Sequence, residues 1–149
     1  MNLIKKKAGI GVGSVYMTLV GIMSLLAVTS MIVIFGVIIQ LHNELVSVAN
    51  IGARVAATTQ NQTQITDAVQ TAMQTLNLPT IYNGNTLFSV SNTTISNAQG
   101  SYLSKVTVNY DAPILFPNAI YGLGQYNSPL PPIFPISASA VYFNENYAP

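Results

Sequence analysis

The stretch KKKAGIGVGSVYMTLVGIMSLLAVTSMIVIFGVII, residues 5–39, decides the fold of this chain. Three lysines open it, and from Ala8 to Asn43 there is no Lys, Arg, Asp or Glu. As a helix, residues 8–39 would be about 48 Å long at ~1.5 Å per residue, whereas the hydrocarbon core of a bilayer is ~30 Å thick. The run is also longer than the roughly 7–15 apolar residues of a cleaved secretory signal. We therefore expect a helix that inserts into a membrane.

The charged residues are few, and their positions give this helix a direction. The 149 residues include five Lys and Arg and four Asp and Glu, far fewer than the roughly one in four of soluble domains. Because the three lysines precede the apolar run, the positive-inside rule predicts a cytoplasmic N-terminus and an external chain after Glu44. The chain has no cysteine, so the external part needs its own core, or neighbours in an assembly, in place of disulfides.

The first helix is predicted to continue out of the membrane as one rod to about Thr59. The sequence QLHNELVSVANIGARVAATT, residues 40–59, is amphipathic and contains no proline. Its apolar residues recur at helical spacing and form one narrow face. These residues are Leu41, Leu45, Val48, Gly52 and Val55.

A second helix is expected over residues 65–76, because its apolar residues follow the i, i+3, i+4, i+7 pattern of a buried stripe. They are Ile65, Ala68, Val69, Ala72, Met73 and Leu76. Thr63 is the expected N-cap, Asp67 lies near the positive end of the helix dipole, and Pro79 prevents the helix from continuing.

Strands are expected after Pro79. TLFSVS (86–91) and SYLSKVTVNY (101–110) flank a turn at 96–100, and ISASAVYF (136–143) alternates apolar and small polar residues. A loop over 113–135 contains six prolines. The order predicts an α+β fold, in which a second helix and a small antiparallel sheet form the head. We divide the chain into a basic leader (1–9), a stalk helix that changes from hydrophobic to amphipathic (10–60) and an external head (61–149).

The titratable residues do not indicate an enzyme. The single histidine, His42, lies at the membrane edge of the first helix, and Glu44 points in a different direction. Asp67, Asp111 and Glu145 fall on three different predicted elements. We therefore expect no catalytic residue, no metal site, no cofactor and no nucleic-acid partner. The glycine-rich GIGVG is not a phosphate-binding loop, because it follows no strand and enters the membrane.

Arg54 is the only Lys or Arg between Lys7 and Lys105. Its simplest role is a solvated side chain, or a pair within the chain with Glu44 or Asp67. The alternative is an intersubunit salt bridge in which Arg54 meets one of these carboxylates on a neighbouring copy.

Two sequons, Asn61-Gln62-Thr63 and Asn92-Thr93-Thr94, fall at predicted turns of the external part. Asn61 and Asn92 are therefore candidate glycosylation sites, although short sequons also arise by chance in a chain rich in Asn and Thr.

The apolar helix contains scattered glycines, of which Gly9 and Gly13 form a small-xxx-small pair, followed by Gly21 and Gly36. Such residues allow helix backbones to approach closely in lipid, and we interpret them as helix-packing positions. The alternative is that glycine is simply commoner in membrane helices than in soluble ones.

Several stretches resemble a known group of proteins. KKKAG followed by a long apolar helix resembles the class III signal of type IV pilin-like proteins. VANIGARVAATT (48–59) resembles the segment after the membrane helix in TadE-like proteins of tight-adherence pilus systems. The later order of an amphipathic helix, a KVTVNY strand, a proline-rich loop and a terminal ISASAVY strand is similar to that group. The low charge and the head rich in Asn, Thr and Tyr also resemble archaeal surface filaments.

This resemblance implies processing by a prepilin peptidase at Lys7, Ala8, Gly9 and Ile10. The cut would fall between Gly9 and Ile10, or between Ala8 and Gly9 in the archaeal style of signal. The fifth mature residue would then be Ser14, where many bacterial pilins carry a glutamate that neutralises a neighbour's new amine. The apolar helix of such a protein packs in the filament core.

Three hypotheses follow. The first is a pilin-like subunit of an extracellular filament for surface adhesion, whose partners are copies of itself, the pilus assembly platform, the peptidase and, before assembly, membrane lipid. The second is a minor TadE-like membrane protein that aids pilus assembly. The third is a single-pass anchor that displays a small binding domain.

Overall fold

The computed structural model describes residues 2–59, 61–82, 84–97, 102–113 and 133–144. Two helices, α1 (Asn2–Thr58) and α2 (Gln62–Thr75), precede the strands. The chain divides into two compact units: one contains α1 as far as Gly36, and the other contains α1 from Val37 together with α2 and all the described strands. The long N-terminal helix, the short second helix and the small antiparallel sheet confirm the predicted α+β fold.

Helix α1 covers the apolar stretch and the amphipathic sequence after it without interruption. Its last turn closes with a hydrogen bond of 2.8 Å from the Thr59 N–H to the Val55 carbonyl, which confirms the predicted end at about Thr59. In the second unit the helix buries a wider face than the sequence predicted. Leu45, Val48 and Gly52 are buried as expected. Four alanines widen the buried face: Ala49, Ala53, Ala56 and Ala57.

Helix α2 begins three residues earlier than expected, and its N-cap is Asn61. The Asn61 Oδ1 accepts a hydrogen bond of 3.0 Å from the Thr63 N–H. The prediction of Thr63 as N-cap is therefore wrong, because Thr63 lies inside the first turn and supplies one of the backbone donors that need a cap. The stripe is confirmed at its buried positions, Ile65, Val69, Ala72 and Met73, whereas Leu76 is the C-cap and is exposed.

The end of α2 is a Schellman motif, in which the two residues after the C-cap bond back to the last turn. The Asn77 N–H donates to the Gln74 carbonyl and the Leu78 N–H to the Met73 carbonyl, both at 3.0 Å. Asn77 has φ 53°, the left-handed conformation in which glycine is usual. Leu78 and Met73 are both buried, so the apolar contact that accompanies this motif holds the chain as it leaves the helix.

Two sheets follow. A short hairpin pairs β1 (Ile81–Tyr82) with β2 (Asn85–Thr86) through Gly84 at φ 79°. After a 3-10 turn, η1 (Val90–Asn92), the main sheet has the order β3-β4-β5 and is antiparallel throughout. Its strands are β3 (Thr93–Asn97), β4 (Leu103–Pro113) and β5 (Ile133–Phe143).

Strands β4 and β5 confirm the predicted strands at 101–110 and 136–143, with Val106 opposite Ala140 and Val108 opposite Ala138. The predicted strand at 86–91 is wrong, because only Thr86 belongs to a strand. Leu87 and Phe88 are adjacent and both buried, which the alternation of a strand does not allow. The predicted turn at 96–100 is wrong at Ser96 and Asn97, which pair with β4 as the end of β3. The predicted loop 113–135 is likewise shorter, because its first residue belongs to β4 and its last three to β5. The rest of both segments lies outside the described residues.

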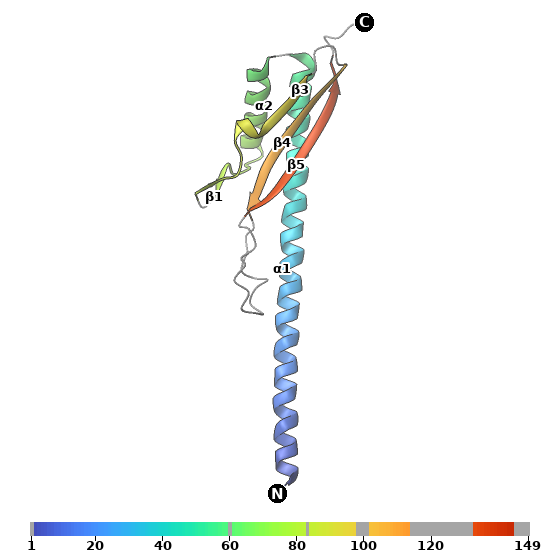
Figure 1. Ribbon diagram of the computed structural model, residues 1–149, viewed down its shortest axis with the longest axis vertical. Helices are drawn as coiled ribbons and strands as arrows, with labels where there is room; N and C mark the ends of the chain where they lie inside the picture. The colour runs from blue at the N-terminus through green and yellow to red at the C-terminus, as the bar shows by residue number, and fades with distance from the viewer. Residues whose placement is uncertain (1, 60, 83, 98–101, 114–132, 145–149) are drawn as a thin grey trace. The chain divides into compact units, whose positions relative to one another are not determined.

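The core lies between the inner face of the main sheet and the two helices (Figure 1). The inner face of β4 is buried at every second residue, from Ser104 to Ala112. The Ser104 hydroxyl donates to the Ala56 carbonyl at 3.2 Å, so a strand residue satisfies one of the free carbonyls at the end of α1. The Tyr110 hydroxyl donates to the Pro79 carbonyl at 2.9 Å and joins β4 to the segment after α2.

Gly52 lies where α2 and β4 both pack closely against α1. A Cβ at Gly52 would lie 2.7 Å from Val69 Cγ2 and 3.2 Å from Val106 Cγ1. The Val69 and Val106 side chains would have to shift to admit a side chain at this position.

Candidate membrane and assembly segment

The surface that stands out in the described chain is the apolar surface of α1 before Gln40. The helix is long and apolar enough to cross a membrane, and its most apolar part is not buried inside the chain. Large side chains are exposed along this whole stretch. They are Val12, Val15, Tyr16, Met17, Leu19, Val20, Ile22, Met23, Leu25, Leu26, Val28, Met31, Ile32, Val33, Phe35 and Ile39. A soluble monomer does not expose a contiguous apolar surface of this extent, so this surface requires lipid or protein neighbours.

Three hydroxyl side chains within this segment are hydrogen-bonded to their own helix. The Thr18 hydroxyl donates to the Ser14 carbonyl at 2.9 Å. The hydroxyls of Thr29 and Ser30 do the same toward the carbonyls four residues earlier, both at 2.8 Å. A hydroxyl that bonds back to its own helix leaves no unpaired donor in lipid or in a packed helix bundle.

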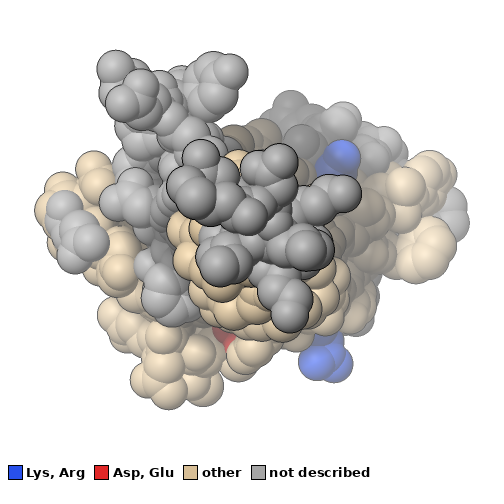
Figure 2. All heavy atoms as spheres, turned by 90° about the horizontal axis from the view of Figure 1, so that it is seen from below, with Lys and Arg blue, Asp and Glu red and all other residues tan. Residues whose placement is uncertain are grey.

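Charged side chains are nearly absent from the described surface as seen from below in Figure 2. Five charged residues have described side chains: Glu44, Arg54, Asp67, Lys105 and Asp111. All five lie after Gln40, so no charge interrupts the described part of the apolar surface.

The glycines proposed for helix packing are not required by contacts within the chain. A Cβ at Gly13, Gly21 or Gly36 would meet no described atom within 4 Å. Each glycine makes a helix less stable than alanine would by up to ~1 kcal/mol. Gly13 and Gly21 are about 2.2 turns apart, and Gly21 and Gly36 about 4.2 turns, so the three do not lie along one line of the helix. The surroundings of Gly9 lie outside the described side chains.

The candidate processing residues Lys7, Ala8, Gly9 and Ile10 all belong to α1, and their side chains lie outside the described part. Cleavage at this place remains a prediction.

Within the part of the chain that the structure describes, Arg54 forms no ion pair with Glu44 or Asp67. Arg54 and Asp67 are exposed, whereas Glu44 is half-buried. Glu44 Oε1 instead accepts a hydrogen bond of 3.0 Å from Gln40 Nε2. The intersubunit salt bridge therefore remains a prediction, with Arg54 and Asp67 as its accessible members.

Tyr110 is a residue whose environment sequence reasoning did not identify. Burial raises the pKa of its hydroxyl to about 12, and the negative charge of Glu44 contributes to the rise. Glu44, on α1, therefore contributes to the raised pKa of a tyrosine in the core of the second unit. The signal in the sequence was the tyrosine on the buried face of a strand, where a hydroxyl needs a partner.

The two sequon asparagines differ in their surroundings. Asn61 is exposed, and its Oδ1 is occupied as the N-cap of α2. Asn92 is half-buried at the end of η1, and its carbonyl accepts a hydrogen bond of 2.9 Å from Asn109 Nδ2. Their glycosylation remains a prediction.

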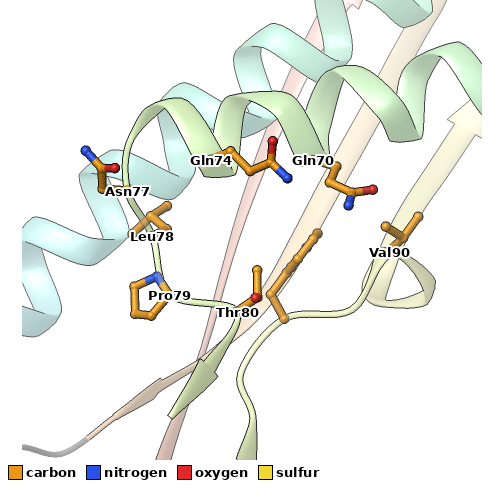
Figure 3. A pocket seen from close by; sticks show the side chains of 8 residues that line it. Gln70, Gln74, Asn77, Leu78, Pro79, Thr80 and Val90 are labelled. Atoms are coloured by element: carbon orange, nitrogen blue, oxygen red, sulfur yellow. The ribbon is translucent and has the colours of Figure 1, made fainter.

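The second unit also contains a pocket of about 510 Å³ between α2 and the segment 77–90 (Figure 3). It is lined by Gln70, Gln74, Asn77, Leu78, Pro79, Thr80, Phe88 and Val90. Sequence reasoning missed it, although the amides at 70 and 74 follow the i, i+4 spacing of one helix face.

Among the described residues, no three His, Asp or Glu side chains lie close enough together to hold a metal ion. No protein-family model matches the chain, and no curated protein or solved structure is detectably similar to it.

Proposed function

We propose that this protein is a pilin-like structural subunit of an extracellular filament for surface adhesion, assembled through the apolar part of α1. One observation carries the proposal: a helix with exposed apolar side chains from Val12 to Ile39 continues without a break into a helix that is part of a folded core. The N-terminal part of α1 thus needs apolar neighbours from outside the chain, whereas its C-terminal part packs into the core of the second unit.

The energetics of assembly support this role. Before assembly the apolar surface would be covered by lipid, and in the filament it would be covered by the same surface of other copies. The transfer from lipid to apolar neighbours changes the hydrophobic free energy little, so close packing at small residues supplies the specificity. Gly13, Gly21 and Gly36 are spread over about 140° of the circumference of α1 at ~100° per residue, so more than one neighbouring helix can approach at them.

The exposed length of α1 favours a filament over a simple anchor. Residues 12–39 span about 42 Å at ~1.5 Å per residue, whereas ~20 apolar residues suffice to cross a bilayer. In the proposed route the precursor has its N-terminus in the cytoplasm, a prepilin peptidase cuts near Gly9, and an assembly platform moves the subunit into the filament.

The experiment introduces the photo-cross-linkable analogue benzoylphenylalanine in place of Phe35, whose side chain is 62% exposed. In protein sheared from the cell surface, we expect cross-links between copies that map to α1. The same variant solubilised as a monomer in detergent is the control and should give none. Cross-links to lipid alone, with no sheared material, would contradict the filament and favour a membrane anchor or a minor assembly protein.

A matched pair of substitutions separates insertion from assembly. Gly21→Leu keeps the helix apolar but adds bulk where neighbouring helices would approach, so we expect normal membrane insertion and a loss of filaments. Val20→Leu adds a single methylene at the adjacent residue and should leave both unchanged. Equal filament yields from the two variants would refute the packing role of Gly21.

A further inference from the structure

The pocket beside α2 has no role in the proposed assembly, and its chemistry is specific. The amide side chains of Gln70 and Gln74 come from one face of α2, that of Asn77 comes from the turn after the helix, and the Thr80 hydroxyl follows (Figure 3). All four side chains are exposed, and none of them hydrogen-bonds to another described residue. We propose that this pocket binds a neutral carbohydrate.

The polar side chains of the pocket match vicinal hydroxyl groups. Each amide offers an oxygen acceptor and an NH₂ donor, and the threonine hydroxyl can do either. A sugar hydroxyl also donates and accepts, so it can pair with any of these groups without a change of protonation. No Lys, Arg, Asp, Glu or His lines the pocket, so an ionic ligand would bury its charge there without a partner.

The apolar side chains of the pocket provide the second half of the match. Leu78 and Phe88 are buried, and Pro79 and Val90 lie beside them. A pyranose ring has one face of C–H groups, which gains from contact with such a surface, while its hydroxyls point toward the amides. The volume of about 510 Å³ lies within the range of small-molecule sites, roughly 300–1,000 Å³.

The backbone around the pocket is fixed before any ligand arrives. The Schellman motif holds Asn77 and Leu78, and the Thr80 carbonyl accepts hydrogen bonds from the N–H groups of Leu87 at 2.8 Å and Phe88 at 3.3 Å. The Tyr110 hydroxyl anchors the Pro79 carbonyl. A site whose backbone is already ordered loses less conformational entropy on binding.

Asn77 allows a test that separates sugar binding from folding. At φ 53° a glycine would be free of strain, and it would lack the amide side chain that lines the pocket. The substitution Asn77→Gly therefore removes a binding group at a position where glycine suits the backbone. This substitution should weaken sugar binding, whereas the folded protein should be as stable as the wild type or more stable.

The experiment uses the full chain in micelles of a zwitterionic detergent that has no sugar head group. Saturation-transfer NMR measures binding of methyl mannoside, methyl glucoside, methyl galactoside and N-acetylglucosamine at millimolar concentrations. We expect at least one sugar to bind, with affinity reduced fivefold or more in Asn77→Gly and in Gln70→Ala/Gln74→Ala. Gln64→Ala changes an exposed glutamine of α2 outside the pocket and is the matched control.

Three results would overturn the proposal: the absence of binding by all four sugars, binding that survives both pocket variants, or binding of a blocked alanine tripeptide in place of the sugars. Thermal unfolding of Asn77→Gly should occur at the same or a higher temperature, so lost binding cannot be attributed to unfolding. The measurement uses solubilised monomers, and its result is therefore independent of whether the protein forms filaments.

The sugar has two possible sources, a foreign surface or the glycans of copies of this chain. Thr63→Ala/Thr94→Ala removes both sequons and keeps the N-cap oxygen of Asn61. Free-sugar binding is measured on protein purified from the native host. If this variant binds more sugar than the wild type, the chain's own glycans compete for the pocket. Unchanged binding identifies a foreign surface, and Asn77→Gly must weaken binding in both cases.

Discussion

Gly52→Ala tests the packing of α1 against α2 and β4 in the second unit. The new Cβ would lie 2.7 Å from Val69 Cγ2 and 3.2 Å from Val106 Cγ1, whereas carbon atoms in good contact are ~3.5–4.0 Å apart. The Val69 methyl would have to retreat by about 1 Å, and a valine in a helix has little freedom to rotate about χ1. Val106, on the central strand β4, faces the same Cβ position and restricts movement toward the sheet.

Two opposing terms set the magnitude. Overpacking a core by one methyl group typically destabilises it by about 1–3 kcal/mol, and replacing glycine by alanine within a helix stabilises it by up to ~1 kcal/mol. We therefore expect Gly52→Ala to lower the free energy of unfolding by about 1 kcal/mol. In a Val69→Ala background the closer contact is gone, whereas the contact of 3.2 Å with Val106 Cγ1 stays. The same substitution should then be close to neutral or stabilise the second unit by less than ~1 kcal/mol. The coupling between the two sites is then about 1–2 kcal/mol.

The assay is amide hydrogen exchange, followed by mass spectrometry, of the full chain in detergent micelles. Peptides from β4 report the free energy of opening of the second unit, separately from the micelle-embedded part of α1. Measurements on the wild type, both single variants and the double variant complete the cycle. If Gly52→Ala has the same effect in both backgrounds, or stabilises the wild type, the reasoning about this contact is refuted.

Two further predictions concern single side chains. The pKa of Tyr110 is raised to about 12 from the ordinary value of 10.0, so the folded protein holds this proton more tightly than the unfolded chain. The free energy of unfolding therefore keeps its full contribution from Tyr110 below pH 10 and should fall as the pH rises toward 12. In a pH series of thermal unfolding, Tyr110→Phe should remove most of this alkaline loss of stability. Because the variant also lacks the hydrogen bond to Pro79, its free energy of unfolding at neutral pH should be lower by about 1 kcal/mol. An unchanged alkaline profile would contradict the raised pKa of Tyr110. Asn61→Ala should destabilise α2 by about 1 kcal/mol through loss of its N-cap, measured by hydrogen exchange of the first turn. Thr63→Ala also destroys the sequon but keeps the cap, so equal exchange in the two variants would refute the capping role.

The sequence predicted the elements whose pattern is continuous over many residues. The uncharged apolar run and its amphipathic continuation predicted α1 to within a residue of its end, and alternation predicted β4 and β5. In each case the period of the apolar residues reports directly which side is buried. The alanines that widen the buried face of α1 gave a weaker signal, because small residues are found in many environments.

The elements that were missed depend on contacts between distant residues. Strand β3 has the polar sequence TTISN and is a strand because it pairs with β4. Leu87 and Phe88 read as part of a strand, but they are held by hydrogen bonds to Thr80 instead. The N-cap was predicted at Thr63 and lies at Asn61, because both residue types cap well and the sequence alone does not distinguish between them. The pocket needed the chain reversal at Asn77, which the sequence LNLP alone did not specify.

The central claim is that the apolar part of α1 assembles with copies of itself outside the cell. The most direct test is the intact mass and N-terminal peptide map of protein sheared from cell surfaces. We expect an abundant fraction of high molecular weight in which the chain starts at Gly9 or Ile10. A chain that still starts at Met1 and is found only in membranes would contradict it and identify α1 as a membrane anchor.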